Sequence, residues 1–298
     1  MPQLTQRQET VAVLGVGTMG HGMAASALRA GLPTVVWDRT PERSHALTGL
    51  GAQVANTAGD AAGRAGIVVT MLPDADAVMS IGMDQGMLDA LSPDAIWVQM
   101  STIGVAGIDR VAALVTTRRP DVTLLDAPVS GSKEPAEQGE LTIFASGPDH
   151  ARSRVTPLFD ALGQRTVWVG PLGAGSRMKL VNNTLLAFKA EGLASSIAIT
   201  HRLGLDTSVV IEALGGGPLL SPWDTGKLQR MANGDYSAQF SLALALKDVH
   251  LALESVDTTR FEAFASLARE WERAVDRGLG GEDLTVVTRA LDDGERLP

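Results

Sequence analysis

The 298-residue chain contains no cysteine, so neither disulfide bonds nor thiol chemistry can contribute. Aromatic residues make up only 4%, and no uncharged apolar run reaches about 18 residues, the length that a membrane helix needs. The N-terminal stretch MPQLTQRQET also lacks the apolar core of a signal peptide. Positive charge is in the minority, with 25 lysines and arginines against 34 aspartates and glutamates, a net charge of -9. Such a surface repels phosphate backbones, so we expect a soluble cytoplasmic protein that binds neither nucleic acid nor membrane.

Two classes of catalytic site also lack support in the sequence. The histidines are scattered without the pairwise spacing of a metal site, so no metal is expected. The pattern G-x-S-x-G of many serine hydrolases does not occur. Hydrophobic residues make up 45% and charged residues 20%, which is ordinary for a globular protein with a large core.

Short apolar segments alternate with helical patterns over the first 170 residues. This alternation predicts a parallel sheet with helices on both faces. After Gly170 the patterns are almost entirely helical, beginning with a long segment at 173–203. We therefore expect an α/β domain over residues 1–172 and an all-helical domain over 173–298, joined by that long helix. The segments expected as strands are 11–16, 34–38, 67–72, 95–100, 123–129, 141–147 and 165–170, and the main expected helices are 18–31, 41–50, 74–82, 107–118, 149–162, 240–256 and 261–278.

The stretch GVGTMG places Gly15, Gly17 and Gly20 in the spacing G-x-G-x-x-G, between an expected strand and an expected helix. Gly15 permits a tight turn, Gly17 lets the backbone approach a pyrophosphate, and Gly20 allows close packing of the helix. The helix N-terminus offers N–H groups and a partial positive charge to the phosphates. We expect a dinucleotide site here that also includes Thr18 and Met19.

The end of the second expected strand bears on which dinucleotide binds. Asp38, 18 residues beyond Gly20, suits the ribose 2′-hydroxyl of NAD and would repel the 2′-phosphate of NADP. Arg39 and Thr40 follow at once, and an arginine there can hold that phosphate. These residues alone leave NAD and NADP both open.

The stretch GAGSRMKLVNN places Lys179 and Asn183 one helical turn apart, so both side chains share a face. It superficially resembles a phosphate-binding P-loop. However, no glycine directly precedes Lys179, and Leu180 stands where a serine or threonine should bind magnesium. Spacing alone favours an ordinary surface lysine over a catalytic one.

Four separated stretches resemble the β-hydroxyacid dehydrogenase family. They are VAVLGVGTMGHGMA, DAPVSGSKEPAEQGELTIFASG, GAGSRMKLVNN and KDVHLAL, in the order expected of the family. The segment SGSKEPAEQG is most similar to the glyoxylate and succinic semialdehyde reductase branch. That branch generally uses NADPH, which gives a slight preference for NADP. Its second strand commonly ends in Asn-Arg-Thr, and Asp38 departs from this pattern.

The resemblance implies a Rossmann domain, a long interdomain helix and an all-α second domain that often forms the dimer, here a homodimer or homotetramer. It implies that Lys179 is the catalytic acid and that Asn183 orients either Lys179 or the substrate. The other implied roles are Ser130 and Gly131 for the substrate carboxylate, Phe240 as a substrate wall, Thr102 between cofactor and substrate, Leu72 and Pro73 beside the nicotinamide half of the cofactor, and Lys247 and Asp248 closing the site from the helical domain.

The expected reaction moves a hydride between nicotinamide and the carbonyl carbon of a small carboxylate-bearing aldehyde or 3-hydroxy acid. A lysine ammonium can both stabilise the developing alkoxide and deliver a proton. An NAD-dependent 3-hydroxyisobutyrate or serine dehydrogenase, and a non-catalytic cofactor-binding scaffold, stay as alternatives. An imine reductase typically has Asp or Tyr in place of the lysine. A 6-phosphogluconate-type dehydrogenase carries His-Asn where this chain has Asn182-Asn183.

Overall fold

The computed structural model describes residues 9–292. The chain forms two compact units, one ending at Lys179 and the other beginning at Leu180. This division falls inside helix α9 (Ala174–Arg202), and the domain boundary expected near 171–173 stays a prediction. Within the described residues, no helix is long and apolar enough to cross a membrane.

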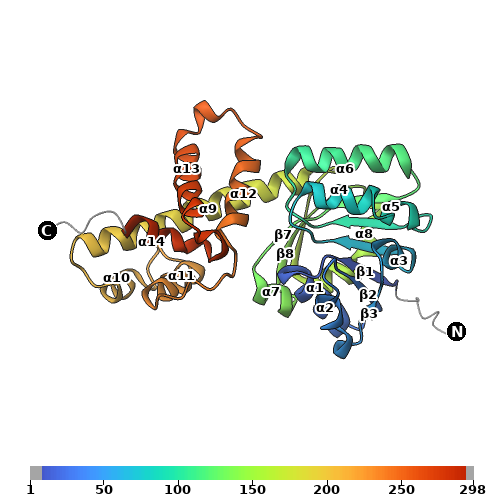
Figure 1. Cartoon of the computed structure of the whole chain (residues 1–298), viewed down its shortest axis with the longest axis horizontal. Helices are drawn as coiled ribbons and strands as arrows, with labels where there is room; N and C mark the ends of the chain where they lie inside the picture. Colours follow the sequence, from blue (N-terminus) through green and yellow to red (C-terminus); the bar gives the residue numbers. More distant parts are fainter. Residues whose placement is uncertain (1–8, 293–298) are drawn as a thin grey trace. The chain divides into compact units, whose positions relative to one another are not determined.

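The N-terminal unit is built on a nine-stranded sheet with the order β3-β2-β1-β4-β5-β6-β8-β7, in which β9 also pairs with β8 (Figure 1). The strands are β1 (Val11–Leu14), β2 (Thr34–Trp37), β3 (Gln53–Val54), β4 (Ile67–Thr70), β5 (Ile96–Gln99), β6 (Thr123–Asp126), β7 (Val129–Ser130), β8 (Leu141–Ser146) and β9 (Gly163–Gly170). The first six pair in parallel. Their order 3-2-1-4-5-6 is that of the Rossmann fold, which confirms the expected fold class.

Both faces of this sheet are covered, as expected. Alternate strand residues enter different cores: Val11 and Val13 of β1 lie in one, and Ala12 and Leu14 in the other. The first core is closed by α1 (Thr18–Arg29), α7 (Lys133–Gln138) and α8 (Arg152–Leu162), and the second by α3 (Ala58–Gly63), α4 (Ala75–Met83), α5 (Met87–Ala90) and α6 (Gly104–Arg118). Figure 1 shows α4 and α6 on one side of the sheet and α1 and α7 on the other. The short α2 (Pro41–His45) follows β2.

The expectation of an all-parallel sheet was wrong beyond β6. Strand β8 runs antiparallel to both β6 and β7. Only residues 131–140 connect β7 to β8, fewer than the dozen or so that a parallel crossover needs. The single strand expected at 123–129 is also interrupted, because Pro128 has no N–H to donate to a ladder. The short elements β3, α3, α5 and α7 were not expected, since a few residues show too little periodicity.

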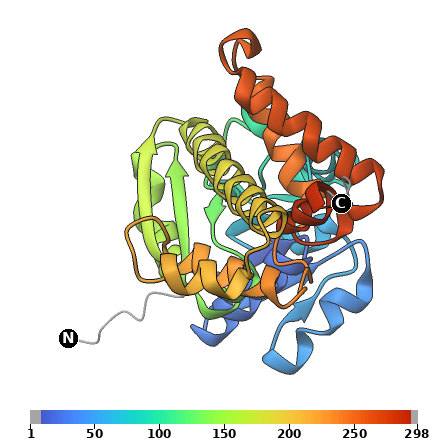
Figure 2. The same ribbon diagram turned by 90° about the vertical axis from the view of Figure 1, so that its left-hand side faces the viewer.

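The C-terminal unit is helical, as expected: between residues 171 and 292, the only strand-like pairing is the isolated bridge Ser241↔Asp283. The 29-residue helix α9 is continuous, the long yellow coil in Figure 2. It is followed by α10 (Thr207–Leu214), α11 (Pro222–Ala232), α12 (Leu242–Leu253), α13 (Glu262–Asp276) and α14 (Val287–Asp292). Trp271 of α13 is fully buried, and its indole N–H donates to Glu191 of α9 at 2.8 Å, so α9 and α13 are joined by both packing and a hydrogen bond.

Candidate active site

The loop after β1 makes a tight turn against the start of α1. Gly15 has a φ of +92°, and a Cβ there would lie 2.5 Å from the carbonyl oxygen of Met71. A Cβ on Gly20 would lie 1.9 Å from the carbonyl oxygen of Gly15. A Cβ on Gly17, by contrast, would meet no atom within 4 Å. Gly15 and Gly20 are therefore required by the protein's own packing, whereas Gly17 borders open space.

This open space fits the phosphates of a dinucleotide. Gly17 is the N-cap of α1, and α1 has neither a side-chain cap nor an acidic residue in its first turn. Helices α3 and α4 differ, since Thr57 and Asp74 cap them. Thr18 is exposed and Met19 half-buried in the first turn of α1. Backbone N–H groups and the helix dipole are thus available to an anion at this position.

The carboxylate of Asp38 is turned back toward the glycine loop. Val16 N donates to one of its oxygens at 2.9 Å and Thr40 N to the other at 2.8 Å. The side chain is only 8% exposed, and Arg43 Nη1 lies 3.8 Å from Oδ1. Arg39 is exposed. Asp38 therefore ties the end of β2 to the loop after β1, with two arginines beside it. The sequence pattern did not single out Arg43, although a basic residue in the short helix that follows β2 was a readable signal.

The loops after β4 and β5 lie beside the glycine loop. The Leu72 side chain comes within 2.7 Å of where a Cβ on Gly15 would be. Leu72 N donates to Ser101 Oγ at 2.8 Å. The buried Gln99 side chain accepts from Ser101 N at 2.7 Å and donates to Ser101 O at 2.8 Å, which fixes the turn that leads into Thr102. Gln99 and Ser101 were not expected; their signal was a polar residue at the end of a buried apolar strand and another two positions later.

Four segments that carry expected cofactor residues therefore lie at one edge of the sheet. They are the glycine loop, the end of β2 and the loops after β4 and β5. This edge includes the point between β1 and β4 where the strand order reverses, the usual ligand position in such sheets. Pro73 follows Leu72 and is exposed. Lys247 lies elsewhere, in the C-terminal unit.

Strand β7 and the start of α9 carry the expected substrate turn and the expected catalytic lysine. Ser130 ends β7 and is half-buried. Gly131 has a φ of +138°, and a Cβ there would lie 2.6 Å from a methyl carbon of Leu141, so the turn requires glycine. Lys179, in the second turn of α9, is also half-buried.

An unexpected residue, Asp126, binds the first turn of α9. It is completely buried at the end of β6. Ser176 N donates to Oδ2 at 2.7 Å and Ser176 Oγ to Oδ1 at 2.8 Å. Burial raises the pKa of Asp126 to about 6, although hydrogen bonds from Ser176 and Ser146 favour the charged form. The sequence did contain a signal for Asp126, namely an acid inside the apolar run TLLDAPV. Such an acid is expected to be buried, and a buried carboxylate needs hydrogen-bond donors.

A second polar cluster lies in the C-terminal unit, between α9 and α12. Asn183 and Asp248 are both 4% exposed, and Asn183 Nδ2 donates to Asp248 Oδ2 at 2.5 Å. Asn182 Nδ2 donates to Asn183 Oδ1 at 2.8 Å. Lys247 Nζ lies 3.0 Å from Asp248 Oδ1. The structure thus brings together Asn183, Lys247 and Asp248, which the sequence placed on two separate helices.

Phe240 lines a small recess that it shares with Asn183, Ala245, Trp271 and Leu284. Its backbone N–H donates to Asp283 Oδ2 at 3.2 Å, and its carbonyl accepts from Leu284 N at 2.9 Å. Two expected residues of the substrate and catalytic set, Phe240 and Asn183, are therefore neighbours.

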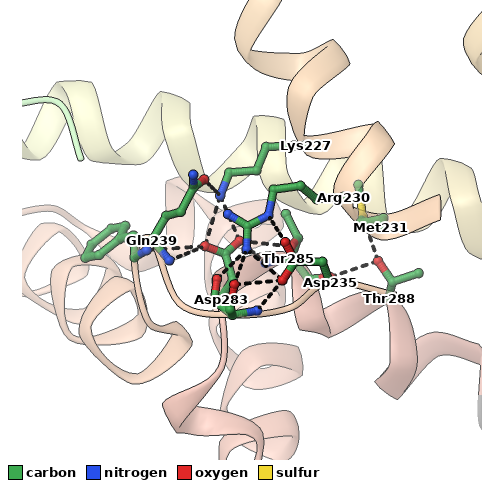
Figure 3. A network of polar contacts seen from close by, with 10 residues as sticks. Lys227, Arg230, Met231, Asp235, Gln239, Asp283, Thr285 and Thr288 are labelled. Carbon is green, nitrogen blue, oxygen red and sulfur yellow. Dashed lines mark hydrogen bonds and ion pairs between the residues drawn. The ribbon is translucent and has the colours of Figure 1, made fainter. Parts of the chain in front are cut away.

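Asp283 is the centre of the network shown in Figure 3. Lys227 Nζ donates to both of its oxygens, at 2.8 and 2.9 Å, and also to Gln239 Oε1 at 3.0 Å. Gln239 N and Thr285 Oγ1 donate to Asp283 as well, at 3.1 and 2.9 Å. Burial by itself would raise the pKa of Asp283, but Lys227 and the other donors outweigh it and hold this pKa below its usual value. The network fixes the segment that precedes α12.

Among the described residues, no group of three or more histidine, aspartate or glutamate side chains could hold a metal ion.

Two sequence families match this chain. Residues 10–170 match the family described as the NAD binding domain of 6-phosphogluconate dehydrogenase. Residues 173–291 match the family described as NAD-binding of NADP-dependent 3-hydroxyisobutyrate dehydrogenase. Together these matches cover both units.

Individual enzymes of known name are also similar to this chain over most of its length. The chain is 30% identical over 287 residues to glyoxylate/succinic semialdehyde reductase 2, chloroplastic, of Arabidopsis thaliana, covering 95% of this chain and 79% of that protein. It is 32% identical over 292 residues to the NAD-dependent L-serine dehydrogenase of Pseudomonas aeruginosa, covering 95% and 97%. The crystal structure of a 3-hydroxyisobutyrate dehydrogenase from Salmonella typhimurium is similar, with a TM-score of 0.85 at 28% identity over 94% of this chain and 99% of that one. The chain therefore belongs to the 3-hydroxyisobutyrate dehydrogenase-like family of β-hydroxyacid dehydrogenases and is an NAD(P)-dependent oxidoreductase.

Proposed function

We propose that this enzyme reduces small carboxylate-bearing aldehydes of the glyoxylate and succinic semialdehyde class, with Lys179 as general acid. The observation that carries the proposal is the pair of hydrogen bonds from Ser176 to Asp126. Ser176 lies in the first turn of α9, just before Lys179, and Asp126 ends the strand that precedes Ser130 and Gly131. A proton donor and a turn suited to a carboxylate thus belong to the same compact unit as the glycine loop.

The roles of the residues follow from their chemistry. A bound nicotinamide dinucleotide would supply the hydride. The Ser130 hydroxyl and the backbone N–H groups of the turn donate to the substrate carboxylate, which needs donors only. The Lys179 ammonium stabilises the alkoxide that forms at the carbonyl oxygen and donates a proton to it. Asn183 and Asp248 orient each other in the helical unit, and Phe240 forms an apolar wall.

We propose NADP as the preferred dinucleotide. The Asp38 carboxylate is only 8% exposed and accepts two backbone N–H groups, while Arg39 and Arg43 are exposed beside it. Two guanidinium groups can hold a 2′-phosphate with several charge-assisted hydrogen bonds. We expect Arg39→Ala to weaken NADPH binding, measured by nucleotide fluorescence, while NADH binding stays the same. Equal losses for both nucleotides would argue against this preference.

A homodimer is proposed on the basis of an apolar stripe on α9. Val181, Leu185, Phe188 and Ile199 recur at helical spacing and are between 41% and 64% exposed. Val181, Leu185 and Phe188 follow one another at spacings of four and three residues, and exposed apolar side chains in such a row are typical of an interface. The cytoplasmic location expected from the sequence stays a prediction.

The proposed function is tested by following nicotinamide absorbance with purified protein. NADPH and NADH are each supplied with glyoxylate or succinic semialdehyde, and the oxidised forms with 3-hydroxyisobutyrate or serine. We expect reduction of the aldehydes and a loss of about a thousandfold or more in turnover for Lys179→Ala, with cofactor affinity retained. The control Lys189→Ala removes another lysine from the same helix, one paired with Asp224 at 2.9 Å, and should keep its turnover.

Other results would contradict the proposal. NAD-dependent oxidation of serine or 3-hydroxyisobutyrate, without aldehyde reduction, would favour the dehydrogenase alternative. Cofactor binding without turnover of any substrate would favour the scaffold alternative. Near-normal turnover in Lys179→Ala would eliminate this lysine as the proton donor.

A further inference from the structure

The first turn of α9 is bound by two strands that are distant from it in the sequence. Both carboxylate oxygens of Asp126 accept from Ser176, one from its backbone N–H and one from its hydroxyl. Gly175 N donates to Ser146 Oγ at 2.9 Å, and Ser146 Oγ donates to the carbonyl of Asp126 at 3.0 Å. Asp126 and Ser146 are themselves paired across β6 and β8. Helix N–H groups that lack intrahelical partners are therefore satisfied by side chains of the sheet.

Gly175 brings this helix turn into direct contact with the sheet backbone. A Cβ on Gly175 would lie 2.5 Å from Phe144 O, 2.6 Å from Asp126 O and 3.0 Å from Pro128 Cδ. The start of α9 is thus set at a short distance from the strand ends. Lys179 lies three residues after Ser176 in the same helix. Because successive turns of a helix are rigidly related, a rotation or shift of the first turn moves Lys179 with it.

The same carboxylate also lies at the start of the segment that carries the substrate turn. Asp126 ends β6, and Ser130 and Gly131 follow a few residues later. Strand β7 pairs with β8 at Ser130↔Thr142, so β8 holds this turn and also supplies the serine that binds α9.

We propose that Asp126 is a positioning residue, which holds the Lys179 helix in register with the strand end that carries Ser130 and Gly131. The proposal rests on the proposed function, in which those residues act on the substrate. Asp126 has no expected contact with substrate or cofactor. It acts through Ser176.

The chemistry of the site distinguishes two replacements of Asp126. Asparagine can accept from Ser176 N through its oxygen and donate to Ser176 Oγ through its amide, because a hydroxyl can also accept. Alanine keeps neither contact and leaves the buried donors of Ser176 without their acceptor. Arg177, next to Ser176, favours the ionised form of Asp126 through its charge, and both replacements lose this interaction because neither has a carboxylate.

The first readout follows Lys179 without requiring turnover. The full-length protein is treated with cyanate, and carbamylation of Lys179 is measured by peptide mass spectrometry relative to Lys189 of the same helix. In Asp126→Ala we expect the Lys179 to Lys189 ratio to change by about tenfold, since two hydrogen bonds to a buried group are lost. Asp126→Asn should return most of the wild-type ratio. The control Thr34→Ala removes a buried hydroxyl of β2 that donates to the nearby Leu32 O at 2.8 Å, and should leave the ratio unchanged.

The second readout is turnover. We expect Asp126→Ala to lower kcat by about ten- to a hundredfold at unchanged cofactor affinity, and Asp126→Asn to restore most of it. If Asp126→Ala does not fold, Ser176→Ala replaces it, because this change removes one of the two contacts and keeps the backbone one. It should change the ratio in the same direction by a smaller amount.

An unchanged carbamylation ratio in a folded Asp126→Ala or Ser176→Ala protein would overturn the proposal. A failure of the proposed function has a different signature, namely no aldehyde reduction by the wild type or normal turnover in Lys179→Ala. In that case the carbamylation ratio still decides whether Asp126 positions Lys179.

Discussion

Asn183 donates a hydrogen bond to Asp248, with 2.5 Å between Asn183 Nδ2 and Asp248 Oδ2. Both side chains are buried, and they join α9 to α12. The amide oxygen of Asn183 accepts from Asn182, so both the nitrogen and the oxygen of this amide are hydrogen-bonded. Helical spacing paired Asn183 with Lys179 on one face of α9, and the structure supplies the partner on another helix.

This contact predicts the effect of removing the amide. Asn183→Ala takes a donor from a buried carboxylate, which costs about 1–3 kcal/mol in the free energy of unfolding. The control Thr184→Ala removes a hydroxyl that donates to Leu180 O of the same helix at 2.9 Å, and should change stability by less than about 0.5 kcal/mol. Urea unfolding of both variants tests this. Equal losses would mean that Asp248 does not depend on Asn183.

The second and third glycines of the motif, Gly17 and Gly20, should respond differently to substitution. Gly17→Val adds atoms where a Cβ meets nothing within 4 Å, so folding is expected to be unaffected while dinucleotide binding is lost. Gly20→Ala places a Cβ 1.9 Å from the Gly15 carbonyl and should destabilise the N-terminal unit. Thermal unfolding and nucleotide titration separate these effects. A folded Gly17→Val protein with wild-type affinity would disprove the assignment of this site.

The ion pair at the centre of Figure 3 predicts a large loss of stability on breaking it. Lys227 and Asp283 are 5% and 1% exposed, so Lys227→Met leaves a buried charge and should cost about 3–5 kcal/mol. Lys189→Met breaks the pair with Asp224, in which the lysine is 35% exposed, and should cost less. The double change Lys227→Met with Asp283→Asn should cost less than the sum of the single changes. Additive losses in urea unfolding would show that the two charges are not coupled.

The raised pKa of Asp126 predicts a pH dependence of stability. With a pKa of about 6 in the folded state against 3.8 normally, the folded protein binds more protons between these values. The contribution of Asp126 to stability is therefore fully present below pH about 3.8 and is lost as pH rises through about 6, an effect of about 3 kcal/mol at most. Asp126→Asn should lack this loss, so its Tm relative to wild type should rise from pH 4 to pH 7. A constant Tm difference would be evidence that Asp126 titrates normally.

The apolar stripe on α9 predicts a change in assembly. Leu185→Glu places a charge on an exposed apolar face and should convert the proposed dimer to monomer without loss of secondary structure. Light scattering combined with size-exclusion chromatography measures this. The control Glu212→Gln changes charge on α10 and should leave the mass unchanged. The same mass for both variants would exclude the stripe as the interface.

Local patterns were sufficient for much of the fold. The apolar run at β1, the glycines after it and the acid at the end of β2 are close in sequence, so their spacing alone indicated the dinucleotide site. The long uninterrupted helical pattern likewise predicted α9 to within about two residues. The mixed sheet was not foreseen, because strand direction depends on how the chain returns after Pro128, which no local period records.

The residue types, their order and the helix face shared by Lys179 and Asn183 are properties of the linear chain, because helical and strand periods are local. Contacts between distant segments depend on tertiary packing. In the sequence, Asp126 is one residue of an apolar strand segment, with no indication of its partners. In the structure, Ser146 of β8 and Ser176 of α9 donate hydrogen bonds to its carboxylate. Asn183 likewise donates to Asp248, which lies 65 positions further along the chain. A buried polar side chain must be satisfied by whichever donor or acceptor the fold brings to it, and that partner is known only once the segments are packed together.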